Sequence, residues 1–570
     1  MKNKEVASIF DRIADALEFK GEQFFRVLAY RKAARIIEEL TEDIEDLNNN
    51  NKLQDIPGVG EGIAKKINEY LRTGRMKKLT EAMQGISKDL LDLLNIQNLG
   101  PKTLRLAYEK LGVRNIKDLK KVIDNGKLAE QFRMGEKKVD NIKKGIQLYE
   151  QARARIPIDV AYEISQYVIN YMKKSKLINQ IDASGSLRRM KETIGDIDIL
   201  ISGKKSQKII AYFIKIPGVI QVLASGETKA SIILGSGEHS RQVDVRVVDA
   251  KSYGAALQYF TGSKEHNVKI RSLAKEKGLK LSEYGVFKNN KYIAGKTEQD
   301  VYTAIGLPWF EPELREDRGE IESALANKLP KIIGYDDIKG DLQMHTTYSD
   351  ANNTIEEMAR AAIKLGYQYI AITDHSKTAS YANGLTEDRL KKEWDEIEKI
   401  QKKLKGIKIF KSTEVDILSN GKLDFVDKIL AQADIVVASI HQGFKHNVTE
   451  RICDAIENPN VDIIAHPTGR LISRREGYDI DLEKVLEHAR KYQKIMEINA
   501  YPNRLDLNDI WSKKAKEMGI KIVISTDSHS KEDLNWMRFG IGVARRAWLE
   551  KTDVVNTLSL EKFKKLFSIK

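Results

Sequence analysis

The part of the chain after residue 335 repeats one unit, in which an apolar run ends in a polar residue and is followed by a helix-like segment. The runs are YIAITDH, IKIFKSTEVDIL, DIVVASIH, VDIIAHP, IMEINAYP and KIVISTDSH, separated by segments such as ANNTIEEMARAAIKLG. Parallel neighbouring strands need a crossover connection, which is usually a helix, so apolar runs that alternate with helices are typical of parallel strands. The pattern predicts a parallel sheet, closed into a barrel with its chemistry at the carboxyl ends of the strands.

Residues able to bind metal stand at or directly after the ends of these runs. They are His345, Asp350, His375, Glu414, His441, His466, Asp527 and His529. A single histidine at such a place is usually a hydrogen-bonded structural residue, but five with three carboxylates at equivalent places indicate a metal centre. Mixed imidazole and carboxylate ligands suit zinc, manganese or iron, which would activate water for attack on a phosphoester.

This region, roughly residues 335–570, resembles the polymerase-and-histidinol-phosphatase (PHP) domain. The motifs DLQMHTTYSD, AITDHS, EVDIL, ASIHQ, AHPTGR and STDSH occur in the order of that family. The resemblance implies a distorted seven-stranded β/α barrel that binds up to three ions through the eight residues above. The chain departs from the family at Gln343, where a histidine is usual, and at Ala351, where a glycine is common. Because an amide is a poorer ligand than imidazole, we expect one weakened metal site and slower hydrolysis or a changed metal preference.

Three carboxylates lie in two apolar runs in the middle of the chain. Asp196 and Asp198 are two residues apart in GDIDIL, and Asp244 follows 46 residues later in VDVRVV. Residues two apart on a strand project from the same face. An isolated Asp-x-Asp is ordinary on a half-buried strand, but three carboxylates on neighbouring strands would hold two divalent ions for phosphoryl transfer. Oxygen ligands favour Mg²⁺ or Mn²⁺.

Small and basic residues precede this acidic cluster. Gly185 and Ser186 predict a turn whose amides and hydroxyl would cradle a phosphate, and Arg188 and Arg189 add positive charge. A negatively charged ligand is therefore expected beside the metal ions.

At this point the chain resembles the family-X DNA polymerases of the nucleotidyltransferase superfamily. GETK at 226–229, YFTGS at 259–263 and SEYGVF at 282–287 follow the acidic cluster in that family's order. The resemblance implies that Asp196, Asp198 and Asp244 hold the catalytic metals, and that Asp244 takes the proton of the primer 3′-hydroxyl. It also implies nucleotide contacts from Gly185, Ser186, Arg189, Tyr259, Phe260, Gly262 and Asn267, and a contact to the template from Arg271. Gln242 stands where the vertebrate repair enzyme has an arginine linked to closure, a departure that bears on how closure is coupled to metal binding.

The first 150 residues read as short helices with glycine-containing turns. The clearest turns are IPGVGEGIAKKI at 56–67, with Gly58 and Gly60, and NLGPKTLRLAYEKLG at 98–112, with Gly100 and Lys102; FRMGEKKVDNIKKGI at 132–146 is weaker. They look like helix-hairpin-helix elements, whose free helix N-terminal amides attract phosphate. Glycine capping of packed helices is the alternative. Such helices should bind the DNA backbone rather than read sequence.

The segment RVLAYRKAARII at 26–37 resembles the domain with which family-X enzymes hold the 5′-phosphate side of a gap. Lys66 falls at the position where some members carry a lysine that excises abasic sugar through a Schiff base. A lysine on the exposed face of a basic helix is more often a phosphate contact, and Gly62 replaces a nearby basic position. Both roles of Lys66 stay open.

Positive charge is concentrated in the same part of the chain. Residues 51–300 contain 46 Lys and Arg against 28 Asp and Glu, and because the whole chain has a net charge of +14, the remainder is slightly acidic. A basic region suits neutralisation of a phosphate backbone, with salt-sensitive binding. An evenly solvated lysine-rich surface is the alternative.

Composition also indicates the cellular compartment in which the protein is expected. The single cysteine, Cys453, excludes an internal disulfide framework and suits a reducing cytosol. No run approaches the roughly 20 apolar residues that span a bilayer. We therefore expect a cytoplasmic protein with no membrane partner, and a monomer.

The motifs and shifts in composition predict a multidomain fold. It comprises a helical DNA-binding domain at 1–85, a fingers-like helix-hairpin-helix domain at 86–155, an α+β nucleotidyltransferase palm at 156–250, a thumb-like nucleotide-selection subdomain at 251–315, a linker at 316–335 and the distorted (β/α)7 PHP barrel at 336–570.

The resemblances together imply a DNA polymerase that adds deoxynucleotides to primer–template or gapped DNA and fills short gaps in base-excision repair. The PHP domain is expected to act as a 3′–5′ exonuclease and as an AP endonuclease. One alternative is a catalytically impaired PHP scaffold, which Gln343 makes credible. Another is a small-molecule phosphatase fused to a DNA-binding module, which would require the three aspartates to be incidental.

Overall fold

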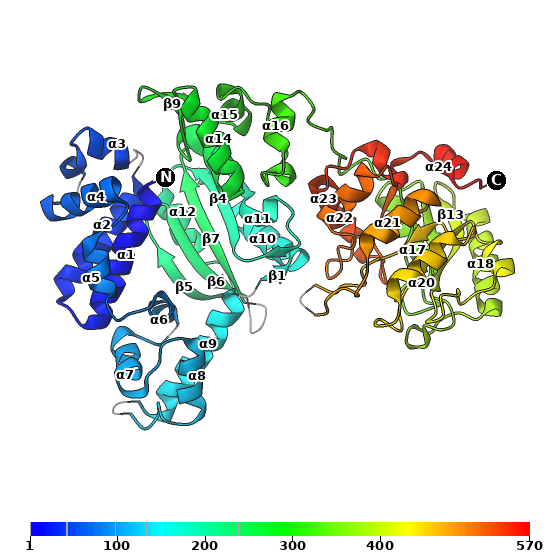
Figure 1. Ribbon diagram of the computed structural model, residues 1–570, viewed down its shortest axis with the longest axis horizontal. Helices are drawn as coiled ribbons and strands as arrows, with labels where there is room; N and C mark the ends of the chain where they lie inside the picture. The colour runs from blue at the N-terminus through cyan, green and yellow to red at the C-terminus, as the bar shows by residue number, and fades with distance from the viewer. Residues whose placement is uncertain are drawn as a thin grey trace.

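The computed structural model describes residues 2–40, 44–56, 58–96, 98–131, 134–153, 155–235, 240–472 and 474–569. Figure 1 shows a helical N-terminal region beside a central sheet, with a barrel at the other side. Phe132 and Arg133, which begin the third glycine turn, lie outside the described residues. Within those residues, no helix combines the length and the apolar character needed to cross a bilayer.

Short helices form the N-terminal region. They are α1 (Lys2–Lys20), α2 (Phe24–Glu39), α3 (Ile44–Asn49), α4 (Glu61–Thr73), α5 (Lys77–Met83), α6 (Lys88–Asp92), α7 (Pro101–Leu111), α8 (Ile116–Asp124) and α9 (Glu136–Arg153). Their apolar faces bury one cluster that includes Phe10, Ile37 and Leu104. Helices α4 and α7 begin after the extended residues Gly60 and Gly100, and neither has a side-chain cap, so amides of their first turns suit an anion, although Pro101 at the start of α7 offers none.

A five-stranded sheet forms the centre of the molecule. Its strands are β2 (Ile178–Ala183), β4 (Ile197–Gly203), β5 (Val219–Ser225), β6 (Lys229–Leu234) and β7 (Arg241–Val248), in the order β2-β4-β7-β6-β5, and they are packed against α10 (Ile158–Met172) and α12 (Ser206–Phe213). Strands β4 and β7 are parallel, whereas their other neighbours are antiparallel. In β7 the buried valines alternate with partly exposed residues, so Asp244 and Arg246 project from the same face.

The next segment forms a smaller domain beside this sheet. It contains α13 (Tyr253–Thr261), α14 (Lys264–Glu276), the antiparallel strands β8 (Lys280–Ser282), β9 (Gly285–Lys288) and β10 (Lys291–Ala294), and α15 (Glu298–Ala304). The segment predicted to be a linker contains α16 (Glu320–Leu325), which buries Glu320, Ile321 and Ala324, whereas residues 325–328 are exposed. Its buried Glu320 contacts His266, with 2.7 Å between Oε1 and Nδ1. This carboxylate can be buried because it has a hydrogen-bonding partner.

The C-terminal domain is a parallel barrel. Its strands follow chain order: β11 (Gly340–Asp341), β12 (Tyr369–Ile372), β13 (Lys408–Asp416), β14 (Ile435–Ser439), β15 (Ile463–Ile464), β16 (Ile495–Asn499) and β17 (Ile522–Ser525). A parallel bridge between Met344 and Ser528 joins the two edges, so the sheet is nearly closed. The predicted distorted seven-stranded barrel is confirmed.

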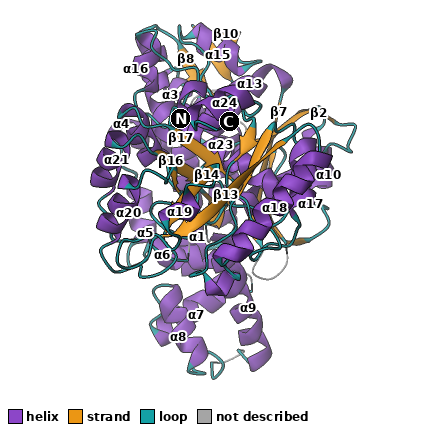
Figure 2. Cartoon of the chain, turned by 90° about the vertical axis from the view of Figure 1, so that its right-hand side faces the viewer, coloured by secondary structure: helices purple, strands orange, loops and turns teal. Residues whose placement is uncertain are grey.

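Helices surround these strands, as Figure 2 shows from the barrel's side of the molecule. They include α17 (Ile355–Lys364), α18 (Glu387–Lys403), α20 (Val448–Glu457), α21 (Leu482–Lys491), α22 (Asp509–Glu517), α23 (Met537–Arg546) and α24 (Leu560–Leu566). Strand β12 is buried along its whole length, which explains its unbroken apolar sequence.

The central sheet and the barrel share one buried apolar cluster. Tyr162 of α10 packs edge-on against Phe539 of α23, with 6.0 Å between ring centres. The barrel is thus fixed against the sheet domain.

Candidate functional sites

Two of the three aspartates predicted to bind metal are direct neighbours in the central sheet. Asp198 of β4 pairs with Asp244 of β7, and both line a cavity of about 180 Å³. Ser231 Oγ donates to Asp244 Oδ1 at 2.5 Å, and Gln242 Nε2 donates to the same oxygen at 3.1 Å. Strand β4 begins at Ile197, so Asp196 belongs to the preceding turn and is not on the strand as the sequence pattern suggested.

Gly185 lets the segment that contains α11 approach this carboxylate pair. Gly185, the first residue of α11 (Gly185–Arg188), has φ of +64°, and a Cβ there would lie 2.3 Å from Asp198 Oδ2. The N–H of Ser184 donates to the carbonyl oxygen of Asp198 at 2.8 Å. A larger residue at 185 would displace the carboxylate, so glycine lets the loop carrying Ser186 and Arg189 approach the acidic cluster.

A cavity of about 280 Å³ lies between helices α13 and α14 and Arg189, the residue directly after α11. It is lined by Arg189, Tyr259, Phe260, Thr261, Gly262, Lys264, Asn267 and Arg271. The structure therefore brings together most of the residues expected to contact the nucleotide and template. Phe260 lines both this cavity and the acidic one.

Asn267 uses its side chain within this domain. Its Nδ2 donates to the carbonyl oxygen of Tyr259 at 2.7 Å, and its Oδ1 accepts from Gln258 Nε2 at 2.7 Å. Asn267 therefore fixes the backbone at Tyr259, and so shapes the cavity.

Arg246 was not predicted from the sequence. It lines the acidic cavity, and its guanidinium lies 4.9 Å from the centre of the Phe260 ring. Its position two residues after Asp244 on one face of β7 is the signal that could have indicated it.

A basic cavity of about 650 Å³ lies between the N-terminal region, the central sheet and the smaller domain. Its basic lining residues are Lys52, Lys204, Lys205, Arg246, Lys251 and Lys280. Lysines that are distant in sequence face one space, so the surplus of positive charge is locally focused.

The glycines of the N-terminal turns differ in their surroundings, because Gly60 and Gly100 face open space whereas Gly58 is closely packed. Gly58 has φ of +89°, and a Cβ there would lie 2.6 Å from Ile36 Cδ1. Lys102 is exposed at the second position of α7. Lys66 Nζ donates to the carbonyl oxygen of Gly62 at 2.8 Å and lies 5.9 Å from the centre of the Tyr30 ring.

Arg31, in the segment resembling the gap-binding domain, has a structural role. Its Nη2 lies 2.6 Å from Asp15 Oδ1 and 2.7 Å from Glu18 Oε2. These pairs fasten α2 to α1.

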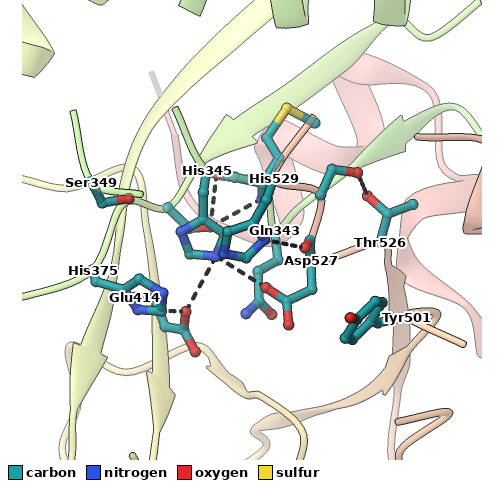
Figure 3. A network of polar contacts seen from close by, with 12 residues as sticks. Gln343, His345, Ser349, His375, Glu414, Tyr501, Thr526, Asp527 and His529 are labelled. Carbon is teal, nitrogen blue, oxygen red and sulfur yellow. Dashed lines mark hydrogen bonds and ion pairs between the residues drawn. The ribbon is translucent and has the colours of Figure 1, made fainter. Parts of the chain in front are cut away.

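The barrel brings its predicted metal ligands together, as Figure 3 shows for several of them. Among the described residues, three overlapping groups have suitably close ligand atoms: His345, Asp350, His375 and His529; His375, Glu414 and His441; and His345, Glu414 and Asp527. His466 adjoins them, because its Nε2 lies 3.0 Å from Glu414 Oε1. Because His345, His375 and Glu414 each belong to two groups, ions bound there would share ligands.

Glu414 is the carboxylate that two of these three groups have in common. It is fully buried, and its oxygens lie 3.4 Å from His345 Nε2, 3.2 Å from His375 Nδ1 and 3.5 Å from His441 Nε2. Burial alone would raise the pKa of Glu414, but His375, His441 and His466 hold this pKa well below its ordinary value. The carboxylate is therefore anionic, as a metal ligand must be.

Burial and the adjacent His345 lower the pKa of His375 to about 3. The ring is therefore neutral near pH 7 and has a lone pair to offer to a metal ion.

Residues behind the ligands orient them. Asp416 Oδ1 lies 2.6 Å from His441 Nδ1, and Asn499 Nδ2 donates to Asp527 Oδ2 at 3.1 Å. Such outer partners fix the tautomer and orientation of a ligand. Neither was predicted from the sequence, although Asp416 follows Glu414 by two residues on β13 and could have been inferred from that spacing.

Gln343 lies beside this cluster (Figure 3). It is fully buried, and neither its Nε2 nor its Oε1 has a hydrogen-bond partner among the described residues. Leaving a buried amide without a hydrogen-bond partner costs free energy, so the space beside the Gln343 side chain suits a polar group. The amide oxygen would suit a metal ion or a water molecule bound to that ion. The donor set therefore fits a metal centre, with a weaker ligand at this position.

We predict that Gln343→His will strengthen this centre. Imidazole is a better ligand than an amide for zinc, manganese and iron, so the variant should bind metal roughly tenfold or more tightly, within the range that ligand-shell changes produce. Metal analysis after dialysis against graded chelator would measure this. Gln432→His, on the barrel surface, is the matched control, and equal metal retention in both variants would contradict the prediction.

Comparison with family models gives four matches. They are a helix-hairpin-helix domain at residues 1–76, a SAM-like helix-hairpin-helix tandem at 90–147, the DNA polymerase beta thumb at 256–316 and the PHP domain at 341–501.

Curated proteins are similar over the whole chain or over parts of it. The "DNA polymerase/3'-5' exonuclease PolX" of Bacillus subtilis (strain 168) is 38% identical over 566 residues, covering 98% of each chain. DNA polymerase lambda of Rattus norvegicus is 28% identical over 342 residues, covering 55% of this chain and 56% of its own. A probable phosphatase of Thermoanaerobacter sp. (strain X514) is 36% identical over 234 residues, covering 38% of this chain and 89% of its own.

Proposed function

Because the chain belongs to the family-X DNA polymerases with a C-terminal PHP domain, we propose that it fills short gaps in DNA during base-excision repair. It is a DNA polymerase that also carries a PHP phosphoesterase domain, and its family implies DNA and deoxynucleoside triphosphates as substrates. Both activities imply divalent metal ions.

The observation that best supports the polymerase site is the pairing of Asp198 with Asp244 beside the cavity that contains Arg189. We assign Asp196, Asp198 and Asp244 as ligands of Mg²⁺ or Mn²⁺, which when bound would stabilise the charge of an in-line displacement. Asp244 would accept the proton of the primer 3′-hydroxyl.

The loop and cavity beside this cluster suit the incoming nucleotide. Ser186 and Arg189 would hold the triphosphate, and Tyr259, Phe260 and Gly262 would contact its sugar. Arg271, in the same cavity, would face the template. Asn267 would act by fixing Tyr259, because its amide is hydrogen-bonded there.

The proposed recognition of gapped DNA is supported by the N-termini of two helices in the N-terminal region. Helices α4 and α7 present uncapped first turns after Gly60 and Gly100, with Lys66 and Lys102 nearby. Backbone amides and ammonium groups in this arrangement favour phosphates without regard to base sequence. We assign Lys66 to the 5′-phosphate side of a gap, as a phosphate contact.

We predict that Lys66→Ala will weaken binding to a one-nucleotide gap with a downstream 5′-phosphate. Losing one phosphate contact should lower the slope of log affinity against log salt by about 0.9. Fluorescence anisotropy over a salt series, with downstream 5′-phosphate and 5′-hydroxyl ends, measures this. Lys399→Ala, an exposed lysine of the barrel, is the control. If Lys66→Ala keeps the wild-type preference for the 5′-phosphate, this assignment is wrong.

The barrel site supports hydrolysis of DNA phosphodiesters. We propose that it acts as a 3′–5′ exonuclease and at abasic sites, with zinc, manganese or iron as its ions. It would remove primer ends that the polymerase cannot extend.

Gln343 favours a second candidate, in which the barrel is a structural domain with impaired chemistry. The exonuclease and the structural barrel are distinguished by incubating the protein with a 5′-labelled primer in Mn²⁺, with and without deoxynucleotides. Shortening without nucleotides supports the exonuclease, and extension without shortening supports the structural barrel. Absence of extension would contradict the polymerase proposal.

A further inference from the structure

An arginine of the barrel contacts the loop that carries the proposed triphosphate ligands. Arg546 is the last residue of α23. Its Nη1 donates to Glu316 Oε1 at 2.7 Å and to the backbone carbonyl oxygen of Arg189 at 2.8 Å. Glu316 Oε1 also accepts from Nε of Arg189 at 3.0 Å. One carboxylate oxygen thus links a guanidinium of the barrel to a guanidinium of the nucleotide cavity.

The barrel holds its side of this contact firmly. Asp509 of α22 accepts from Arg546 Nε at 3.0 Å and from Arg318 Nη1 at 2.9 Å. Arg546 is only 3% exposed. Burial alone would raise the pKa of Glu316, but Arg546 and Arg189 lower this pKa below its ordinary value. The contacts are therefore charge-assisted and directional.

Two other barrel residues contact the same loop. Gly542 lies one turn before Arg546 and packs on Met190, because a Cβ there would lie 2.7 Å from Met190 Cε. Arg470 binds Glu192 in a bidentate pair, with 2.6 Å and 3.1 Å between nitrogen and oxygen atoms. The loop is thus contacted by the barrel at residues 189, 190 and 192.

We propose that the barrel is part of the polymerase's nucleotide-binding apparatus, with Arg546 as a positioning residue that holds Arg189 toward the triphosphate through Glu316. The inference rests on the proposed role of Arg189 in binding nucleotide. A charged group held in place before the ligand arrives loses less freedom on binding, so positioning strengthens the contact. Polymerase activity then depends on the folded barrel but not on the metal ions of the barrel.

Removal of Arg546 should affect the triphosphate contact of Arg189 and the metal-binding aspartates differently. The carbonyl oxygen of Arg189 loses a donor, and Glu316 loses one of its three cationic partners and keeps Arg189 and Lys191. The guanidinium of Arg189 becomes less ordered, whereas the Asp198–Asp244 pair is untouched. Binding of the nucleotide should weaken more than the chemical step slows.

The test uses the full chain with Arg546→Gln and Arg546→Lys on a one-nucleotide gap in Mg²⁺. Arg546→Gln should raise KM for the deoxynucleotide about tenfold, change kcat less than twofold and leave exonuclease activity unchanged. Lysine keeps the positive charge but lacks the planar set of guanidinium donors, so KM of Arg546→Lys should lie between those of the wild type and Arg546→Gln. Arg360→Gln removes an exposed arginine paired with Glu356 on α17 and is the matched control.

A double-variant cycle tests the route through Glu316. If Arg546 acts through Glu316, the combination Arg546→Gln with Glu316→Gln should raise KM no further than the larger single effect. Additive effects would overturn the proposed route. If Arg546→Gln lowers both activities and the thermal midpoint, Asp509→Asn decides, because it keeps the arginine and weakens its anchor, together with the contact to Arg318. A raised KM in Asp509→Asn then supports the inference.

An unchanged KM in Arg546→Gln, or in Asp509→Asn where the first variant unfolds, overturns the inference. This failure is distinguishable from failure of the proposed function. Wild-type protein that adds nucleotides, with variants of unaltered KM, contradicts only the positioning role. Wild-type protein that adds no nucleotide contradicts the polymerase assignment from which it starts.

Discussion

Asp244→Asn is expected to lower nucleotide incorporation roughly a thousandfold, which corresponds to about 4 kcal/mol of transition-state stabilisation from metal-held charge. Asp244 is the register partner of Asp198 and lies in the same cavity. Asparagine has nearly the same shape and keeps an oxygen that accepts from Ser231 and Gln242. The change therefore removes the anion and the proposed base while keeping the local packing.

Single-turnover extension of a primer in a one-nucleotide gap is the measurement, with exonuclease shortening followed in parallel. Asp249→Asn, an exposed carboxylate five residues further on, is the control. Exonuclease activity should be unchanged, because the barrel ligands lie in another domain. Near wild-type extension by Asp244→Asn would remove Asp244 from the metal site and from the catalytic assignment.

The sequence predicted most of the barrel because burial there leaves a local pattern. Strand β12 is apolar along its whole length, and a polar segment that includes His375 follows its end directly. Parallel strands place their carboxyl ends at one edge, so the pattern of apolar runs was enough to group ligands that are far apart in sequence.

The same logic predicted the Asp198–Asp244 pair but misplaced Asp196. A spacing of two residues predicts one face only if both residues are on the strand, and β4 begins at Ile197. Where a strand starts depends on its partners, which local sequence does not specify.

Contacts between domains left no sequence signal. Arg546 and Glu316 are 230 residues apart, and each alone reads as an ordinary surface charge. The segment containing Glu316 was therefore predicted to be a linker, and nothing in the segment 26–37 indicated that Arg31 pairs with Asp15 and Glu18. Burial of a charge becomes apparent only when its partner is placed beside it.

The second large effect is expected from Glu414→Gln, which should abolish shortening of DNA and leave extension intact. Glu414 is buried and contacts His345, His375, His441 and His466 through its two oxygens. Glutamine keeps the volume but removes the negative charge that two of the three metal groups share, so metal content should fall with activity. We expect at least a thousandfold loss of exonuclease rate, a loss of several kcal/mol of metal-dependent stabilisation.

The measurements are metal analysis after gel filtration, shortening of a 5′-labelled primer without nucleotides, and extension of the same primer in a gap. Glu356→Gln, on the exposed face of α17, is the matched control. Retained shortening in Glu414→Gln would place the nuclease outside this cluster. Extension should survive, because the contacts from Arg546 and Gly542 to the polymerase loop involve no barrel ligand. Loss of metal together with loss of extension would show instead that the ions themselves hold the barrel against the polymerase.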